Sequence, residues 1–345
     1  MAEKKLRYDG FDLLKFICSI LIIFLHINPF PEESFARFIT KGIANIGVPI
    51  FFILSGFFFS LKLNNSDVAE HPKILKKYIA RLLTLLAIWT VPYFFICDLP
   101  WIIKGNIFLN LFEYLKHVLL GGSGYFLWYI VSLIFGTVYY YFLRNLKPHI
   151  TFLIVLILFL IGSIGTSYTQ ILQGTFFEKV LYSYNNIFFT LRNGLFFGLP
   201  CIYLGTVIAQ KKDKINISKS LICFLFTAII FAIECYCLFK NHLTVKTIQA
   251  SVILLSIGCV LLMLNVKINL GKYSLILRKL SFLIYVIHPL YIRIILLLLP
   301  INGTIEYYWY VFWWMQIPVI IILSIITGLI LIKSSEKIRF LKKAI

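Results

Sequence analysis

Apolar runs long enough to cross a membrane recur along the whole chain, and they restrict its fold more than any other feature. A transmembrane helix needs about 20 apolar residues to cross a hydrocarbon core about 30 Å thick. Charged residues and breaks rich in Pro, Gly or Asn divide the sequence into ten such spans. These lie near residues 11–29, 42–61, 82–97, 124–143, 149–167, 187–209, 220–239, 247–265, 281–299 and 308–332. We therefore expect an all-α integral membrane protein with ten transmembrane helices.

The composition leaves no room for a soluble domain. Of the 345 residues, 60% are hydrophobic and only 14% are charged, so residues 1–345 are predicted to form one transmembrane domain. The net charge of +19 does not predict nucleic-acid binding, because the basic residues form short clusters between the spans. The first span has no small-residue cleavage site, and we expect it to be retained as a helix.

The distribution of basic residues predicts the orientation. Both terminal segments and alternate loops hold 23 Lys and Arg, whereas the opposite loops hold 7. Since positive charge accumulates on the cytoplasmic side, both termini are predicted to be cytoplasmic in a multi-pass protein of the cell membrane. The opposite loops, residues 98–123 and 168–186, are long and aromatic, so they are expected to be re-entrant or to lie at the membrane surface.

The seven cysteines indicate neither a disulfide framework nor a metal site. Most of them lie inside apolar runs, and no two form a C-x-x-C pair. We expect no bound metal.

Three ionisable residues in the first span are the strongest candidates for function. Asp12, Lys15 and His26 lie in DLLKFICSILIIFLH. At about 100° per residue, the eleven residues from Lys15 to His26 make three turns plus about 20°, with a rise of about 16 Å. Both side chains should therefore face the bundle interior, with Asp12 paired to Lys15. Alternatively, Lys15 snorkels to the interface and His26 is a hydrogen-bonded structural histidine.

Two further spans carry polar residues among small and aromatic ones. Ser55 lies in NIGVPIFFILSGFFFS, where glycines allow close helix packing and a hydroxyl can bond across the bundle. Trp128 lies in GGSGYFLWYIVSLIF, which fits an interfacial aromatic belt or the wall of a substrate groove.

Later spans add four candidates for substrate binding or support. Arg192 and Asn193, about one turn inside the sixth span, can bind an anionic group or, for the arginine, snorkel. Glu234 is a possible partner of Arg192 or a proton carrier. His288 precedes Pro289, which frees a carbonyl one turn back that His288 or Tyr285 can satisfy.

Taken together, these segments resemble the acyltransferase 3 family of integral membrane acyltransferases. A basic residue, ten intervening residues and a histidine follow DGFD, as in the first span of that family. VPIFFILSGFFF, GYFLWYIVSLI and LSFLIYVIHPL are similar to its later motifs, in the same order. The family usually has arginine where this chain has Lys15, and lysine lacks the planar fork for bidentate phosphate binding. Within the family, NIFFTLRNGLFFGLP and LWYIVSLIFG look most like the membrane half of the vancomycin-resistance serine racemases.

The resemblance implies transfer of an acyl group, most often acetyl, from cytoplasmic acyl-CoA to a hydroxyl of a cell-envelope acceptor such as a saccharide. His26 would then be the general base or a transient acyl carrier, since a neutral imidazole suits proton removal near pH 7. Lys15, with Asp12, would attract the phosphates of the donor, helped by the basic inner loop 62–81 unless that loop is only a positive anchor. The enzyme hypothesis requires a cavity from the cytoplasm that reaches His26.

Two other functions remain open from the residues. A transporter of a small zwitterion such as serine can use Arg192 for the carboxylate, with Lys15, His26 and Glu234 inside the bundle. An accessory or flippase-like subunit is the third possibility.

Overall fold

Helices make up most of the part of the chain that the computed structural model describes, which is residues 8–27, 30, 34–122, 126–241, 243, 246–298 and 305–345, with only the backbone for 305–314. The α-helices are α1 (Asp9–Ile27), α2 (Phe35–Asn45), α3 (Gly47–Asn64), α4 (His71–Tyr93), α5 (Leu99–Ile102), α6 (Ile107–Leu120), α7 (Trp128–Leu143), α8 (Pro148–Ser167), α9 (Phe176–Phe188), α10 (Leu199–Lys211), α11 (Ile217–Lys240), α12 (Ala250–Asn265), α13 (Tyr273–Leu298) and α14 (Ile305–Lys337). Two π-helical segments, η2 (Phe94–Asp98) and η5 (Gly194–Gly198), join α4 to α5 and precede α10.

Eight helical segments in these described ranges are long and apolar enough to cross a membrane. They are Asp9–Ile27, Phe35–Asn64, Val68–Ile102, Pro148–Ser167, Gly194–Lys214, Ile217–Lys240, Tyr273–Leu298 and Met315–Lys337. Two shorter apolar helices, Trp128–Leu143 and Ala250–Asn265, lie where the other two spans are predicted. The all-helical membrane class is therefore confirmed, while the count of ten and the cytoplasmic termini stay predictions.

Several predicted boundaries are wrong, and three of them affect the site. The ninth span begins at Tyr273 rather than 281, and the third continues a helix that starts at His71, so most of the predicted inner loop 62–81 is helical. The sixth begins at Gly194 rather than 187, because the chain leaves α9 through Phe189, whose φ is 64°. Apolar patterns missed the starts of the third and ninth helices because charged residues occupy these helix termini.

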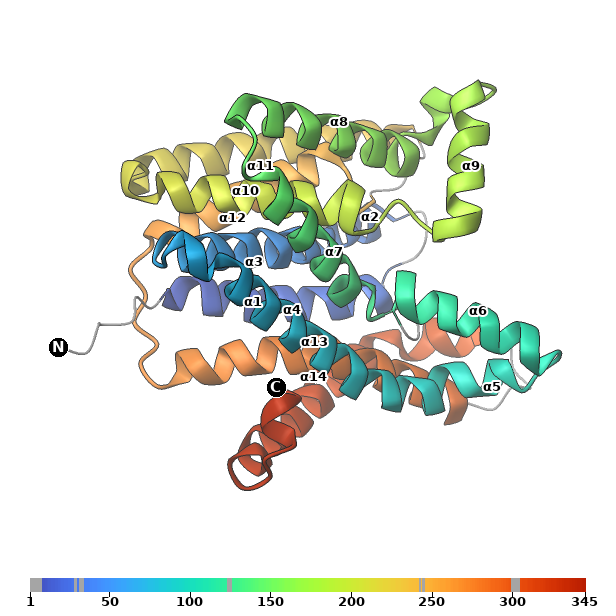
Figure 1. Ribbon diagram of the computed structural model, residues 1–345. Coiled ribbons are helices and arrows are strands. Elements are labelled where there is room, and N and C mark those ends of the chain that lie inside the picture. Colours follow the sequence, from blue (N-terminus) through green and yellow to red (C-terminus); the bar gives the residue numbers. More distant parts are fainter. Residues whose placement is uncertain are drawn as a thin grey trace.

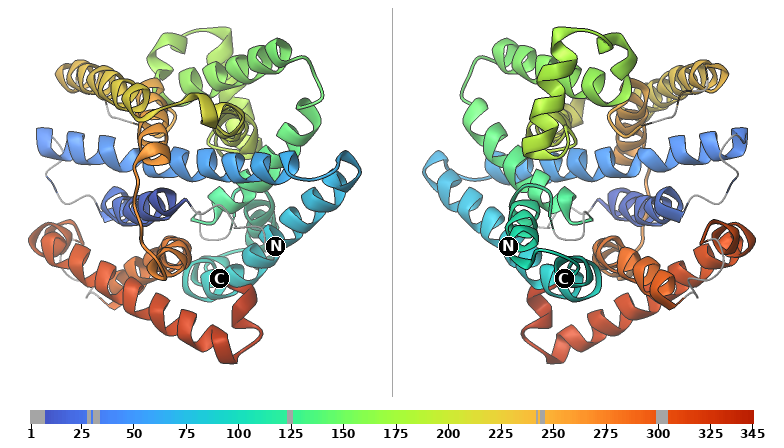
Figure 2. Two further views of the ribbon diagram at one scale, coloured as in Figure 1. Left: turned by 90° about the vertical axis from the view of Figure 1, so that its left-hand side faces the viewer. Right: turned by 90° about the vertical axis from the view of Figure 1, so that its right-hand side faces the viewer.

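Helix α3 is the centre of the bundle. Figures 1 and 2 show it crossing the middle of the molecule, with α8, α10 and α11 on one side and α13 and α14 on the other. It packs most extensively against α10. A side-chain carbon at Gly56 would collide with the backbone of Ile202, and one at Gly205 with the backbone of Ile53. These glycines let the two backbones approach closely, as small residues do between membrane helices.

The predicted outer loops are helical in large part. Residues 98–123 hold α5 and α6, and residues 168–186 hold most of α9; these helices gather at the right-hand end of Figure 1, opposite the start of α1. Many of their large apolar side chains are exposed, for example Phe108 and Phe176. Exposed apolar helices at one end of the bundle fit the expected position at the membrane surface.

Candidate active site

A cavity of about 470 Å³ opens beside the first halves of α1 and α13 and the start of α4. Four basic side chains line it, namely Lys15, Arg81, Arg278 and Lys279, and we call it the cation-lined cavity. Its other walls are Ile22, Val48, Phe51, Ser55, Phe58, Tyr78, Leu82, Tyr129, Leu275, Ser281, Phe282, Tyr285 and Ile345. A cluster of cations around a concave, largely apolar cavity favours a ligand with an anionic group and an apolar part.

Lys15 faces this cavity, as predicted. Its ammonium nitrogen lies 4.6 Å from the centre of the Phe58 ring, a cation–π contact that holds the side chain against α3. Ile22, which lies between Lys15 and His26 on the same stripe of α1, also lines the cavity. Lys15 and Ile22 thus share the face of α1 that lines the cavity, which ends one turn before His26. The predicted cavity that reaches His26 itself is therefore not found in this form, and a common face for Lys15 and His26 stays a prediction.

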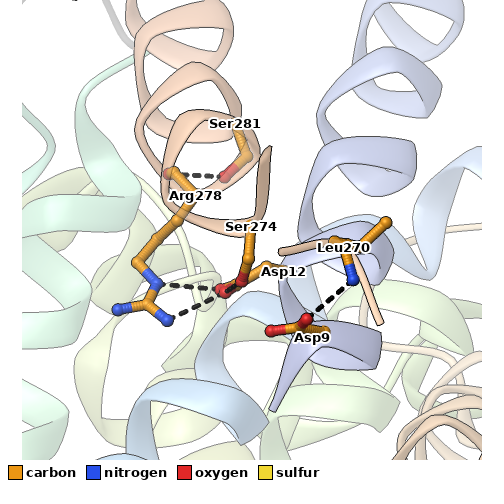
Figure 3. A network of polar contacts seen from close by, with 6 residues as sticks. All are labelled: Asp9, Asp12, Leu270, Ser274, Arg278 and Ser281. Carbon is orange, nitrogen blue, oxygen red and sulfur yellow. Dashed lines mark hydrogen bonds and ion pairs between the residues drawn. The ribbon is translucent and has the colours of Figure 1, made fainter. Parts of the chain in front are cut away.

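The predicted pairing of Asp12 with Lys15 is wrong. Figure 3 shows the carboxylate of Asp12 between α1 and α13, where it accepts hydrogen bonds from Arg278 Nε (2.9 Å), Arg278 Nη2 (2.8 Å) and Ser274 Oγ (2.6 Å). Nearby, Asp9 accepts a hydrogen bond from the backbone amide of Leu270 at 2.8 Å. Asp12 is fully buried, so it positions Arg278 rather than meeting a ligand itself.

His26 lies where α1 meets the loop before α7 and the middle of α13. Its ring centre lies 5.2 Å from that of Phe126 and 5.4 Å from that of His288. The side chain is nevertheless exposed, although it does not line the cation-lined cavity. Tyr285, which does, donates a hydrogen bond to the carbonyl of Phe126 at 2.6 Å. A wall residue of the cavity, Tyr285, thus bonds directly to the residue whose ring packs on His26.

His288 is fully buried beside this histidine. Its Nδ1 lies 2.7 Å from the carbonyl oxygen of Ile284 and must donate there, because a carbonyl only accepts. Helix α13 continues through Pro289, and the carbonyl that bonds to His288 Nδ1 is that of Ile284, not that of Tyr285, which the proline leaves without its helical donor. The other ring nitrogen, Nε2, is then an acceptor, and it has no hydrogen-bond partner in the described part of the chain. This leaves a buried polar atom for a substrate group or a water.

Arg192, which packs against Trp128, places a positive charge near His26. The guanidinium carbon of Arg192 lies 5.4 Å from the ring of Trp128, and its charge acts electrostatically on His26. The Arg192 side chain is exposed and makes no hydrogen bond to any residue that the structure describes. Arg192 was predicted to lie about one turn inside the sixth span. It lies before the helix instead, because η5 begins only at Gly194. Its position suits stabilisation of a negative charge next to His26.

Asn193, another predicted site residue, has a structural role. Asn193 caps η5: its Oδ1 accepts from the backbone amides of Leu195 (3.0 Å) and Phe196 (3.1 Å), and its Nδ2 donates to Tyr184 Oη (2.7 Å). Every donor and acceptor of that amide is close to a partner within the fold. It fixes the start of α10 behind Arg192, as an N-cap does.

Glu234 is not the partner of Arg192. It accepts hydrogen bonds from the Tyr168 hydroxyl and from the Ser251 backbone amide at 3.1 Å, and so joins α11 to the end of α8 and the start of α12. Burial and this bond raise the pKa of Tyr168, which therefore keeps its proton for the bond.

Ser55, by contrast, does line the cation-lined cavity. Its hydroxyl donates a hydrogen bond to the carbonyl of Phe51 (2.7 Å) and lies 3.2 Å from Tyr129 Oη.

The sequence interpretation missed Arg278 and Lys279, named Arg81 only as part of the basic loop 62–81, and named Tyr285 only as a partner for a freed carbonyl. Arg278 and Lys279 were assigned to an inner loop, among the basic residues that orient the spans. A signal existed in Ser274 and Arg278, which are four residues apart and would share a face with Asp12 if the ninth helix began earlier.

A bundle of apolar helices around a cation-lined cavity and an accessible imidazole defines a multi-pass membrane protein with a polar site inside the bundle. Comparison with known protein families is more specific. The model of a family described as "Acyltransferase domain" matches residues 8–333, and the chain belongs to that family of membrane acyltransferases.

Curated relatives carry a different name. An "Amino-acid racemase" of Enterococcus faecalis is 30% identical over 240 residues, which is 65% of this chain and 32% of the relative. A second "Amino-acid racemase" of the same species is 27% identical over 304 residues, 84% of this chain and 42% of the relative. A "Serine/alanine racemase" of Enterococcus gallinarum is 28% identical over 245 residues, 66% and 33%. The aligned part of the chain spans 32–42% of the length of these relatives. No solved structure matches the chain.

Proposed function

We propose that this protein transfers an acyl group, most simply acetyl, from cytoplasmic acyl-CoA to a hydroxyl of an acceptor in the cell envelope. The family supports acyl transfer in general. The observation that carries the proposal of the donor is the cation-lined cavity, which runs along α1 from Lys15 to one turn before His26.

The cavity walls suit the two ends of acyl-CoA. Lys15, Arg81, Arg278 and Lys279 supply the charge for its phosphates. Arg278 uses Nε and one Nη2 hydrogen for Asp12, which leaves three of its five N–H groups for a ligand. The apolar side chains deeper in the cavity fit the pantetheine arm, whose thioester would lie towards Tyr285.

The residues around His26 provide the groups for acyl transfer. The imidazole takes the proton of the acceptor hydroxyl as its oxygen attacks the thioester carbonyl carbon. The tetrahedral intermediate then carries a negative charge on the former carbonyl oxygen, next to Arg192. When it collapses, the C–S bond breaks, the CoA thiolate leaves and the imidazolium returns a proton to the sulfur. An ester and free CoA are the products.

The test is an assay of the purified full chain with [¹⁴C]acetyl-CoA, following transfer to envelope saccharides and hydrolysis to acetate. Loss of a general base lowers the rate by about 10²–10⁴-fold, and we expect that loss for His26→Ala. His149→Ala, at the exposed start of α8, is the matched control and should keep full activity. Wild-type protein that neither binds CoA nor releases it as a thiol would refute the proposal.

Transport of a small amino acid is the second candidate, and the names of the racemase relatives support only the choice of an amino acid such as serine as its substrate. In that case Arg192 would bind the carboxylate of serine. Proteoliposomes would accumulate labelled serine in the wild type and not in Arg192→Gln, without any turnover of acetyl-CoA. Accumulation that survives Arg192→Gln would count against this role of the arginine.

A further inference from the structure

His288 is a fully buried titratable residue that the proposed acyl transfer does not use. It lies in the middle of α13, one turn after Tyr285. Its Nδ1 donates to the carbonyl of Ile284, which fixes Nε2 as an acceptor, and Nε2 has no donor within the described ranges. A buried polar atom without a partner destabilises a fold, so one that is retained in an apolar helix indicates a function.

The ring beside this orphaned nitrogen belongs to His26 of α1. The two ring centres lie 5.4 Å apart, with an angle of 36° between the ring planes. Two imidazoles joined by a straight N–H···N bond of about 2.9–3.0 Å have ring centres about 5.3 Å apart, because each nitrogen lies about 1.2 Å from its ring centre. The observed separation is therefore that of a bonded pair. The bond is not made in this structure, and it requires a turn of the exposed His26 ring about its own side-chain axis.

The turn of α13 that carries the orphaned nitrogen is held on two sides. Tyr285 donates to the carbonyl of Phe126 at 2.6 Å, and the Phe126 ring packs edge-on against His26 at 5.2 Å. From α4, the hydroxyl of Tyr93 donates to the carbonyl of Val286 at 3.0 Å. The acceptor is thus part of a rigid support, whereas the ring that it faces is exposed and can turn.

A general base works best when a third group fixes its tautomer and orientation, and a carboxylate often does so. The two carboxylates considered for the site are used elsewhere, since Asp12 bonds to α13 and Glu234 joins α11 to α8 and α12. The positive charge of Arg192 also acts on His26. A proton taken up by that imidazole therefore needs an acceptor to share it, and the lone pair of a neutral imidazole provides one without adding a charge.

We propose that His288 is the positioning residue of His26. Its Nε2 accepts a hydrogen bond from one N–H of His26, so that the other His26 nitrogen is left unprotonated and directed at the acceptor hydroxyl. That nitrogen takes the hydroxyl proton and later gives it to the leaving sulfur, while the bond to His288 is kept and His288 itself gains and loses no proton. This role rests on the proposed acyl transfer, whereas the pairing of the two imidazoles is a property of the fold alone.

The kinetic test uses the purified full chain and acetyl-CoA, with transfer or hydrolysis as the readout. His288→Leu removes the acceptor and leaves no buried polar side-chain atom, and we expect it to lower kcat about 10–100-fold, the loss seen when the outer partner of a working imidazole is removed. The KM for acetyl-CoA should not change. His288→Gln offers an acceptor oxygen near the position of Nε2 and should restore most of the rate. His149→Leu makes the same change at the exposed start of α8 and should behave like the wild type.

A spectroscopic test needs no catalysis. Protein labelled with ¹⁵N in its histidines is measured at pH 7.5 without substrates, and the signals of His26 are assigned by their loss in His26→Gln. We expect a single neutral tautomer of His26 in the wild type and in His288→Gln, and a mixture of both tautomers in His288→Leu. His288→Phe, which also lacks an acceptor, repeats both measurements if the leucine variant does not fold.

The outcomes separate the two proposals. A His26 tautomer that depends on His288, in a protein without acyl transfer, would refute the proposed function and keep the pairing. Acyl transfer with an unchanged kcat in His288→Leu would overturn the positioning role alone. Two His26 tautomers in the wild type, or a single tautomer that His288→Leu retains, would overturn the pairing and leave the orphaned nitrogen to a water or a substrate group. A fall in kcat that His288→Gln does not restore, with the tautomer unchanged, would show a purely structural role.

Discussion

The ion pair between Asp12 and Arg278 gives a quantitative prediction, because its two members differ greatly in exposure. The side chain of Asp12 is 0% exposed, whereas that of Arg278 is 49% exposed. Arg278→Gln leaves the carboxylate buried with one remaining bond, from Ser274. Removing one partner of a buried pair costs about 3–5 kcal/mol, and we expect a loss of that size in the free energy of unfolding.

The opposite change should cost less. Asp12→Asn keeps an acceptor oxygen for Arg278, and the half-exposed guanidinium can turn towards water, so we expect a loss of about 1.5–3 kcal/mol, the value of hydrogen bonds to a charged group. In the double variant no charge is left buried. Its loss should therefore be smaller than the sum of the single losses, by a coupling of about 0.5–3 kcal/mol.

The assay is unfolding of the purified protein in mixed micelles with a rising fraction of dodecyl sulfate, followed by circular dichroism. Lys279→Gln removes a cation that lines the same cavity but forms no ion pair with any described residue, and should change stability by less than about 0.5 kcal/mol. Equal losses for Asp12→Asn and Arg278→Gln, or additive losses in the double variant, would show that the reasoning from burial is wrong.

Two further predictions concern packing and pH. Gly56→Ala should destabilise the protein by about 1–3 kcal/mol, because the new carbon meets the backbone of Ile202, while Gly121→Ala, whose nearest contact is at 3.4 Å, should cost much less in the same unfolding assay. Burial lowers the pKa of His117, which stacks on Phe189 at 3.8 Å, so the fold favours its neutral form. Its contribution to stability is present above the unfolded pKa of about 6.5 and is lost as the pH falls through the lower folded value. Unfolding midpoints between pH 7.5 and 5 should fall more steeply for the wild type than for His117→Gln, and parallel curves would refute this.

Much of the fold could be predicted from apolar runs. These give the membrane class and the approximate positions of the helices, because a spanning helix cannot be built without them. The inward position of Lys15 could also be predicted, because a cation inside an apolar span is expected to face the bundle interior, and Lys15 does line a cavity there.

The boundaries and partners could not be predicted in this way. Charged residues such as Arg278 look like loop residues in a hydropathy pattern, although they lie in the first turns of α13. Asp12 had Lys15 as a neighbour on its own helix, yet the bidentate geometry of Arg278 on another helix satisfies the carboxylate better. Asn193 and Glu234 carry groups suited to a site, but nearby backbone amides use them.

Sequence by itself therefore determined that the chain has many apolar helices long enough to cross a membrane and that Lys15 faces the bundle interior, because both follow from local patterns in the chain. Only the tertiary structure decided that Arg81, Arg278 and Lys279 gather around Lys15, and that His288 of α13 lies beside His26 of α1. These groups come from helices far apart in the chain, and how such helices cross is set by packing between side chains, which no single segment encodes.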